Sequence, residues 1–202
     1  MGKMMRFFVL SVIISALFIL GGLLADKQML QEKLIRLHVV ANSDSEQDQN
    51  DKLIVKDAVI SYLQENTANI QSTADAKKFL SKNLDKIQQV VNQTLEKMQV
   101  PYIGKVSLDL EKFSTRVYET FSLPSGVYNA LRIELGTGAG ENWWCVAFPS
   151  LCMPKTSEEF HTKAIEAGLQ ENLVGTISDE QYKIRFFLLD CIGKIENFFY
   201  FA

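Results

Sequence analysis

The segment GENWWCVAFPSLC, residues 140–152, holds both tryptophans of the chain and two of its three cysteines. A cysteine acts as a nucleophile when a histidine base lies within hydrogen-bond reach, and the chain has two histidines. One of them, His38, alternates with apolar residues in the segment LIRLHVVA, and Asn142 or Asp44 could orient its ring. These residues allow one enzymatic chemistry, that of a hydrolase which uses Cys145 with His38.

Other features of the sequence argue against an enzyme. No local signature of a cysteine hydrolase surrounds Cys145, and a strand residue flanked by Trp144 and Val146 is poorly exposed for attack. No two His or Cys residues have a common metal-ligand spacing such as CxxC or HxxxH. The glycine-rich residues 136–140 lack the order of a phosphate loop and precede a strand. We therefore predict no enzymatic activity, no metal, no cofactor and no small-molecule substrate.

The first residues of the chain form an export signal. Lys3 and Arg6 precede an uncharged apolar run at residues 7–25, and the next charge is Asp26. About 20 apolar residues cross the hydrocarbon core, and a positive flank stays on the cytoplasmic side. We predict that residues 1–25 are a signal peptide or a signal anchor, which holds the chain in the membrane through residues 7–25 if it is not cleaved. Both outcomes stay open, because the sequence before Asp26 matches a cleavage site poorly.

The rest of the chain, residues 26–202, is long enough for one exported domain. A net charge of -3 without a basic run argues against nucleic acid as a partner. Three cysteines leave at least one thiol unpaired. Cys145 and Cys152 are the natural disulfide pair if the chain reverses at Pro149. The alternative is three buried, reduced thiols.

The hydrophobic periodicity predicts the elements that must position these residues. Residues alternate as in strands over 34–41, 106–111, 130–135 and 143–148, and have helical spacing over about 46–63, 73–99, 157–168 and from 178 on. Ser45 with Asp48 resembles a capping box, and so does Ser178 with Gln181. The closing segment FFYFA is apolar and either packs on the sheet or forms an exposed partner site.

These elements predict an α+β fold. We expect one domain in which an antiparallel sheet of about four or five strands packs against four or five helices, preceded by an N-terminal hydrophobic helix. Within a strand, Trp143 and Trp144 point to opposite faces of the sheet. If one face is open, an exposed tryptophan is a candidate contact, because tryptophan is enriched at binding hot spots.

Two long segments carry a resemblance to a known family. LIRLHVVANSDSEQDQNDKLIVKDAVISYL, from residue 34, together with GAGENWWCVAFPSLC, residues 138–152, resembles the stage II sporulation protein R family of endospore-forming bacteria. The likeness extends from Leu34 to about Leu189, and the apolar leader is similar in place and kind to that family's export signal.

The resemblance implies a signalling function. Members of that family look like signals that are exported from the forespore into the intermembrane space of the septum. There they activate a membrane-embedded aspartic protease, which processes the precursor of the mother-cell sigma factor, sigma-E. An exported hydrolase using Cys145 with His38 remains the alternative function.

The resemblance supplies no contact residues, so the partner face is a hypothesis from the polar and aromatic residues of the two segments. These residues are Arg36, His38, Asn42, Ser43, Asp44, Glu141, Asn142, Trp143 and Trp144. In the alternative interpretation they form a structural junction, in which ANSD caps a helix and GENWW packs against it.

Overall fold

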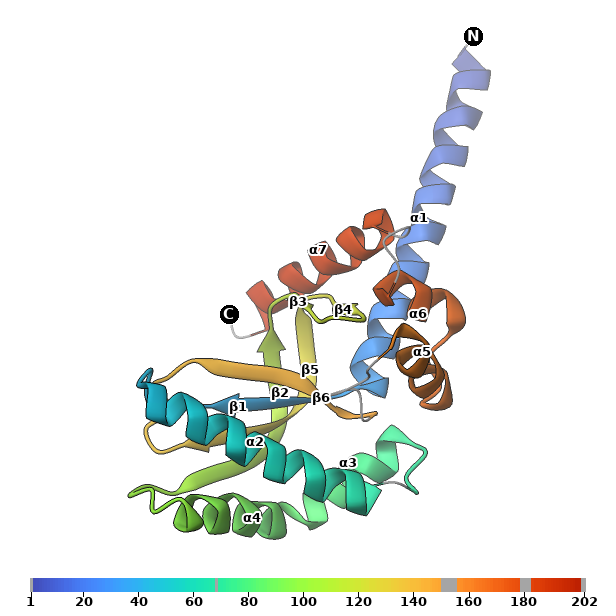
Figure 1. Ribbon diagram of the computed structural model, residues 1–202. Helices are drawn as coiled ribbons and strands as arrows, with labels where there is room; N and C mark the ends of the chain where they lie inside the picture. The colour runs from blue at the N-terminus through green and yellow to red at the C-terminus, as the bar shows by residue number, and fades with distance from the viewer. Residues whose placement is uncertain (1, 68, 150–155, 179–182, 201–202) are drawn as a thin grey trace.

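The computed structural model describes residues 2–67, 69–149, 156–178 and 183–200 (Figure 1). Its elements follow the chain in this order: α1 (Gly2–Lys33), β1 (Ile35–Val40), α2 (Glu46–Thr67), α3 (Thr73–Lys82), α4 (Leu84–Lys97), β2 (Gly104–Phe113), β3 (Arg116–Val117), β4 (Ser122–Leu123), β5 (Gly126–Leu135), β6 (Asn142–Phe148), α5 (Ser157–Glu166), α6 (Glu171–Ser178) and α7 (Lys183–Phe199).

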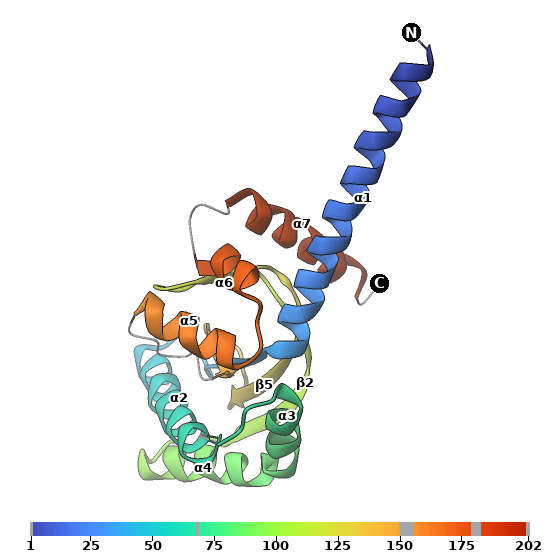
Figure 2. The ribbon, with the colours of Figure 1, turned by 90° about the vertical axis from the view of Figure 1, so that its right-hand side faces the viewer.

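The domain has three layers with a four-stranded sheet, in the order β2-β5-β1-β6, as the middle layer. Helices α2, α3 and α4 cover one face, while α5, α6, α7 and the end of α1 lie on the other (Figures 1 and 2). A separate hydrophobic cluster fills the space on each face. The α+β class and the leading apolar helix are confirmed.

One strand pairing differs from the antiparallel sheet that the sequence predicted. β1 is antiparallel to β6 and β5 is antiparallel to β2, but β1 and β5 are parallel, with Leu37 opposite Leu131. The chain between β1 and β5 passes through three helices and the strands β2, β3 and β4, and a long crossover of this kind is what parallel neighbours require. The sheet is therefore mixed.

The alternating sequence of β1 predicted a strand that is buried on one face. In the structure β1 is buried along its whole length and on both faces. Ile35, Leu37 and Val39 face α2–α4. The alternating residues Arg36 and His38 face the other side of the sheet, against Phe113 and Trp144. Because both faces of the sheet are covered by helices, the polar side chains Arg36 and His38 are enclosed as well. Alternation in a sequence indicates which residues share a face, but not whether the polar face reaches solvent.

The helix expected over residues 73–99 is two helices that meet at Asn83. The side-chain amide of Asn83 donates a 2.8 Å hydrogen bond to the carbonyl oxygen of Phe79. Such a side-chain bond competes with the helical backbone ladder and favours a break. Its effect here is that α3 and α4 can each lay an apolar side against the sheet.

The predicted helix starts in the C-terminal part of the chain are displaced. The side chain that caps α5 belongs to Thr156, one residue before the expected Ser157, and accepts from the backbone N–H of Glu159. Ser178 ends α6 instead of starting a helix, and its hydroxyl donates to the carbonyl oxygen of Val174 at 2.7 Å. Gln181 lies outside the described residues.

α1 runs without interruption through the predicted boundary between residues 25 and 26. In the part of the chain that the structure describes, it is the one helix long and apolar enough to cross a membrane. Its first turns project away from the domain (Figures 1 and 2), whereas Leu23 and Leu30 are buried in the core. The apolar segment is thus joined to the domain by a continuous helix.

Gly193 allows α7 to approach the sheet. A Cβ at this position would collide with the carbonyl oxygen of Ser125, and the Ser125 hydroxyl donates to the carbonyl oxygen of Asp190 at 2.9 Å. Gly193→Ala in an open helix would stabilise the helix by about 1 kcal/mol. Here we expect the opposite sign, a loss of about 2 kcal/mol, because α7 must move off the Ser125 backbone.

Thermal unfolding of the detergent-solubilised chain measures this effect. Ile195→Ala is the matched control, since Ile195 is exposed on the same helix and its truncation should change the midpoint little. An unchanged or raised midpoint for Gly193→Ala would contradict the packing of α7 described above.

Candidate functional site

The two unusual segments of the sequence meet at the end of β1. Val40 lies opposite Asn142 and His38 opposite Trp144 in the antiparallel pairing of β1 with β6. The loops that follow β1 and precede β6, residues 41–45 and 136–141, therefore lie together. We call these two loops with Asn142 the β1–β6 corner. It contains five of the nine residues of the predicted partner face, and the other four lie on β1 and β6 beside it.

Hydrogen bonds tie the two loops of the corner into one unit. The Asn42 side-chain oxygen accepts from the backbone N–H of Thr137 at 2.9 Å, and an Asp44 carboxylate oxygen accepts from that of Glu141 at 2.7 Å. The backbone N–H of Gly140 donates to the carbonyl oxygen of Ala41 at 3.0 Å. A Cβ on Gly140 would collide with the backbone of Ser43, so only glycine allows this approach.

Asp48 joins the corner to the start of α2. Its carboxylate accepts from the Ser43 hydroxyl at 2.5 Å, the Tyr102 hydroxyl at 2.6 Å and the Asn42 amide at 2.9 Å. The pKa of Asp48 is lowered to about 2; the hydrogen bond from Ser43 has the largest effect, and that from Tyr102 the next largest. The Ser45 hydroxyl accepts from the backbone N–H of Asp48 at 3.2 Å, which confirms the predicted cap. The polar residues 42–45 thus support the fold directly.

Lys52 is a member of the site that the sequence did not reveal. Its side chain is buried, and its ammonium donates to the carbonyl oxygen of Glu141 at 3.0 Å and to the Gln49 side chain at 2.6 Å. Burial lowers the pKa of Lys52. Nothing in the spacing of Lys52 distinguishes it from Lys56, the other lysine of α2, so only the fold could identify it.

Arg36, a predicted contact residue, is enclosed in the core. Its guanidinium lies 4.3 Å from the ring centre of Phe113 and 5.2 Å from that of Tyr128. Two of its nitrogens donate hydrogen bonds, to the carbonyl oxygen of Cys145 and to the hydroxyl of Tyr118. Because the side chain has no exposed surface, it supports the site from within and cannot touch a partner in this conformation.

His38 is also buried, under the indole of Trp144. The two rings stack with centroids 3.7 Å apart. Nδ1 lies 2.8 Å from a Glu111 carboxylate oxygen, and Nε2 lies 2.7 Å from the side-chain oxygen of Asn142. Glu111 also accepts from Arg132 at 2.7 Å. Burial raises the pKa of Glu111, but His38 and Arg132 outweigh burial and leave it lowered.

The two tryptophans lie on opposite faces of the sheet, as strand geometry requires. Trp143 packs with the cluster under α2, where the Lys56 ammonium lies 5.0 Å from its ring centre. Trp144 packs with the other cluster, and the Arg116 guanidinium lies 4.7 Å from its ring centre. Each indole is half-buried. Both tryptophans therefore keep some exposed surface at the rim of the corner.

The geometry contradicts the hydrolase alternative that pairs Cys145 with His38. Cys145 lies opposite Leu37, and both side chains belong to the cluster under α2–α4. His38 is one residue further along β1 and points to the other face, against Trp144. The sheet itself separates the sulfur from the imidazole, so the histidine cannot act as the base for this cysteine.

The sulfur of Cys145 is also not a thiol in this structure, because Cys145 is disulfide-bonded. Cys191 is a free cysteine on α7. Cys152 lies outside the described residues, so the predicted pair of Cys145 with Cys152 stays a prediction.

The exposed residues of the predicted partner face are Asp44, Glu141 and Asn142. Asp44 and Asn142 are held by hydrogen bonds of their side chains, whereas the hydrogen bonds of Glu141 are made by its backbone. The Glu141 carboxylate is thus presented to solvent from a fixed backbone. The surface of the corner combines acid, amide and indole groups on a rigid frame.

Comparison with known proteins assigns this arrangement to a family. The model of the family described as stage II sporulation protein R matches residues 31–158, a range that includes the whole sheet and the corner. The chain belongs to the stage II sporulation protein R family. It is 30% identical over 189 residues to stage II sporulation protein R of Bacillus subtilis (strain 168), with 83% of each chain covered. No solved structure matches the chain.

The pKa of Asp48 leads to a prediction about acid stability. Since the folded-state pKa of about 2 lies below the ordinary value of 3.8, the carboxylate stabilises the fold fully above about pH 5. That contribution is lost as the pH falls from about 4 to about 2. Asp48→Asn should cost about 2 kcal/mol at neutral pH. The difference in the free energy of unfolding between Asp48→Asn and the unchanged chain should become smaller in acid, because the unchanged chain then loses the same carboxylate.

Thermal unfolding of both chains between about pH 2.5 and pH 7 tests this dependence. Asp57→Asn is the control, because Asp57 is an exposed acid on the same helix whose ion pair with Lys56 should contribute less than about 1 kcal/mol. A difference for Asp48→Asn that does not change with pH would show that the carboxylate is not the group that ties the corner to α2.

Proposed function

We propose that this family member is an exported sporulation signalling protein that activates a membrane-embedded aspartic protease across the septum. Activation would trigger processing of the precursor of the mother-cell sigma factor. The observation that carries the proposal is the family match, whose residues 31–158 contain the complete β1–β6 corner. The relative from Bacillus subtilis carries sporulation in its name.

The construction of the corner supports a role in binding. Its loops are fixed by backbone hydrogen bonds and by Asp48, so the exposed Glu141 and the rims of Trp143 and Trp144 need little ordering when a partner binds. A preorganised surface loses less conformational entropy on association. A half-buried indole beside exposed polar groups is a common arrangement at binding hot spots.

The position of α1 supports export and leaves the corner accessible. Lys3 and Arg6 precede the apolar run, which favours a cytoplasmic N-terminus and a domain on the other side of the membrane. α1 ends just before β1, and the corner follows the far end of that strand. Figure 1 shows the start of α2 at the side of the domain away from α1. A partner in a facing membrane could reach the corner whether α1 is retained or cleaved.

Activation by binding requires a difference in affinity between two states of the protease. A ligand shifts such an equilibrium only as far as it binds one state more tightly. We propose that the corner makes its contacts with the active arrangement of the protease. The signalling protein would then act without chemistry of its own.

Glu141→Arg tests the proposed partner face. The exposed side chain can change without loss of the hydrogen bonds that the Glu141 backbone makes. In cells that contain the protease and the sigma factor precursor, we expect this reversal of charge to reduce precursor processing by about tenfold or more. Immunoblotting of the precursor and its product measures the effect.

Glu65→Arg is the matched control, because Glu65 is an exposed acid at the other end of α2. It should leave processing unchanged. Each variant is first checked for export and for a normal thermal midpoint. Normal processing with a folded, exported Glu141→Arg chain would reject the corner as the partner face.

A further inference from the structure

α7 carries an apolar stripe that faces away from the domain. Ile184, Phe187, Leu188, Ile195, Phe198 and Phe199 recur at helical spacing on one side of the helix, and their exposed fractions range from 37% for Leu188 to 79% for Ile184. A stripe of this width is normally the core-facing side of a helix. Here it extends along the whole helix and is left open.

The orientation of α7 is fixed by its other side. Leu189 and Gly193 are buried against the domain, and the carboxylate of Asp190 accepts from the backbone N–H of Ser125 at 2.8 Å. The helix therefore cannot turn its apolar stripe inward without breaking these contacts. The stripe is a stable feature of the surface.

Polar bonds attach α7 to α1 where the apolar run of α1 ends. Arg185 pairs with Asp26 at 2.5 Å, and Glu196 pairs with Lys27 at 2.7 Å and accepts from Gln31 at 2.8 Å. Asp26 and Lys27 are the first charged residues after the apolar run. One end of α7 lies beside α1 in Figure 1, and the two helices cross in Figure 2.

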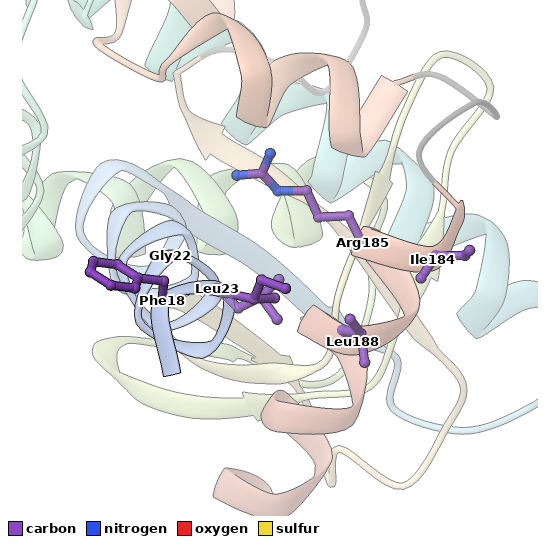
Figure 3. Close-up of a pocket in the computed structure, with 7 residues that line it drawn as sticks. Phe18, Gly22, Leu23, Ile184, Arg185 and Leu188 are labelled. Carbon is purple, nitrogen blue, oxygen red and sulfur yellow. The ribbon is translucent and has the colours of Figure 1, made fainter. Parts of the chain in front are cut away.

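The two helices form an open apolar groove of about 570 Å³ beside this attachment. Phe18, Gly22 and Leu23 line it from α1, and Ile184, Arg185 and Leu188 line it from α7 (Figure 3). The groove joins the exposed apolar side of α1 to the stripe of α7. The two apolar surfaces are thus continuous.

We propose that the stripe of α7 docks on the lipid bilayer that α1 enters. The charged residues that end an apolar span lie at the membrane interface, and Asp26 and Lys27 hold α7 at that depth. An amphipathic helix at the interface buries its apolar face in the boundary between headgroups and acyl chains. The proposal relies on the export orientation proposed above, but not on activation of a protease.

Docking of α7 would give the domain a second attachment to the membrane and fix its orientation. α7 would also stay docked after cleavage next to Ala25, because Asp26, Lys27 and Gln31, which hold α7, would remain in the domain. The signal would then stay at the membrane surface in either form. The β1–β6 corner lies on another part of the domain and stays free.

Depth-dependent fluorescence quenching tests the docking of α7. The full chain is prepared with Cys191→Ser, to remove the free cysteine from α7, and with Phe187→Cys or Phe198→Cys labelled with an environment-sensitive dye. It is reconstituted in vesicles of phosphatidylethanolamine and phosphatidylglycerol that contain brominated acyl chains. We expect at least about twofold quenching at both positions, because bromine quenches only dyes that reach the acyl chains.

Ile54→Cys provides the matched control, since Ile54 is an exposed apolar residue on α2, in the layer on the other face of the sheet. Its dye should not be quenched. Phe187→Asp should abolish quenching of the dye at residue 198 without a change in the thermal midpoint, because Phe187 is exposed.

Two outcomes would overturn the proposal. Quenching on α7 that is no stronger than at Ile54→Cys would show that the stripe does not enter the lipid. Fluorescence that instead depends on the ratio of protein to lipid, with self-quenching between labelled chains, would assign the stripe to contact between copies. Because the assay contains no protease, a result against membrane docking would not bear on the proposed signalling function.

Discussion

The covering of β1 on both faces is the constraint on which the rest of the structure depends. A strand in that position must find most of the hydrogen-bond partners of its polar groups within the protein, since water does not reach it. Among the described residues, Nη1 of Arg36 is buried without such a partner. Arg36 lies between aromatic rings and under carbonyl and hydroxyl oxygens, and His38 is held between Glu111 and Asn142. These contacts require β2, β5 and β6 in one register, so the buried polar residues help to specify the sheet.

The same strand also gives rise to the β1–β6 corner. Because β1 pairs with β6, the loop that starts α2 and the loop that precedes Trp143 must share one end of the sheet. Asp48 and Lys52 then fasten α2 to those loops. Most polar residues of the corner therefore have structural partners, and only three of the nine residues of the predicted partner face are exposed. One hydrogen-bond network thus holds both loops of the corner in place.

A second connection runs from the core to the apolar leading helix. The end of α1 packs on the sheet through Leu30, and its polar residues hold α7. The apolar segment and the part of α1 that packs in the domain therefore belong to one continuous helix, with no flexible linker between them. Movement of α1 would be transmitted directly to the folded domain.

The sequence by itself determined much of this protein. The apolar leader, the α+β class, the main strands and most helices follow from local hydrophobic periodicity, and the Ser45 cap of α2 follows from local hydrogen bonding. The two long segments at Leu34 and Gly138 were sufficient to indicate the family. The polar and aromatic residues of those segments also supplied the residues of the candidate site, whereas the structure showed that the two segments pair.

The tertiary structure decided what depends on distant segments. Parallel pairing of β1 with β5, burial of Arg36 and His38, and the roles of Lys52 and Glu111 arise from elements that are far apart in the sequence. Separation of Cys145 from His38 required the register of two strands. Likewise, the apolar stripe of α7 is indistinguishable from a core face until the packing of its other side is known. Local patterns specify which residues share a face, but only the assembled layers determine whether that face meets protein, water or lipid.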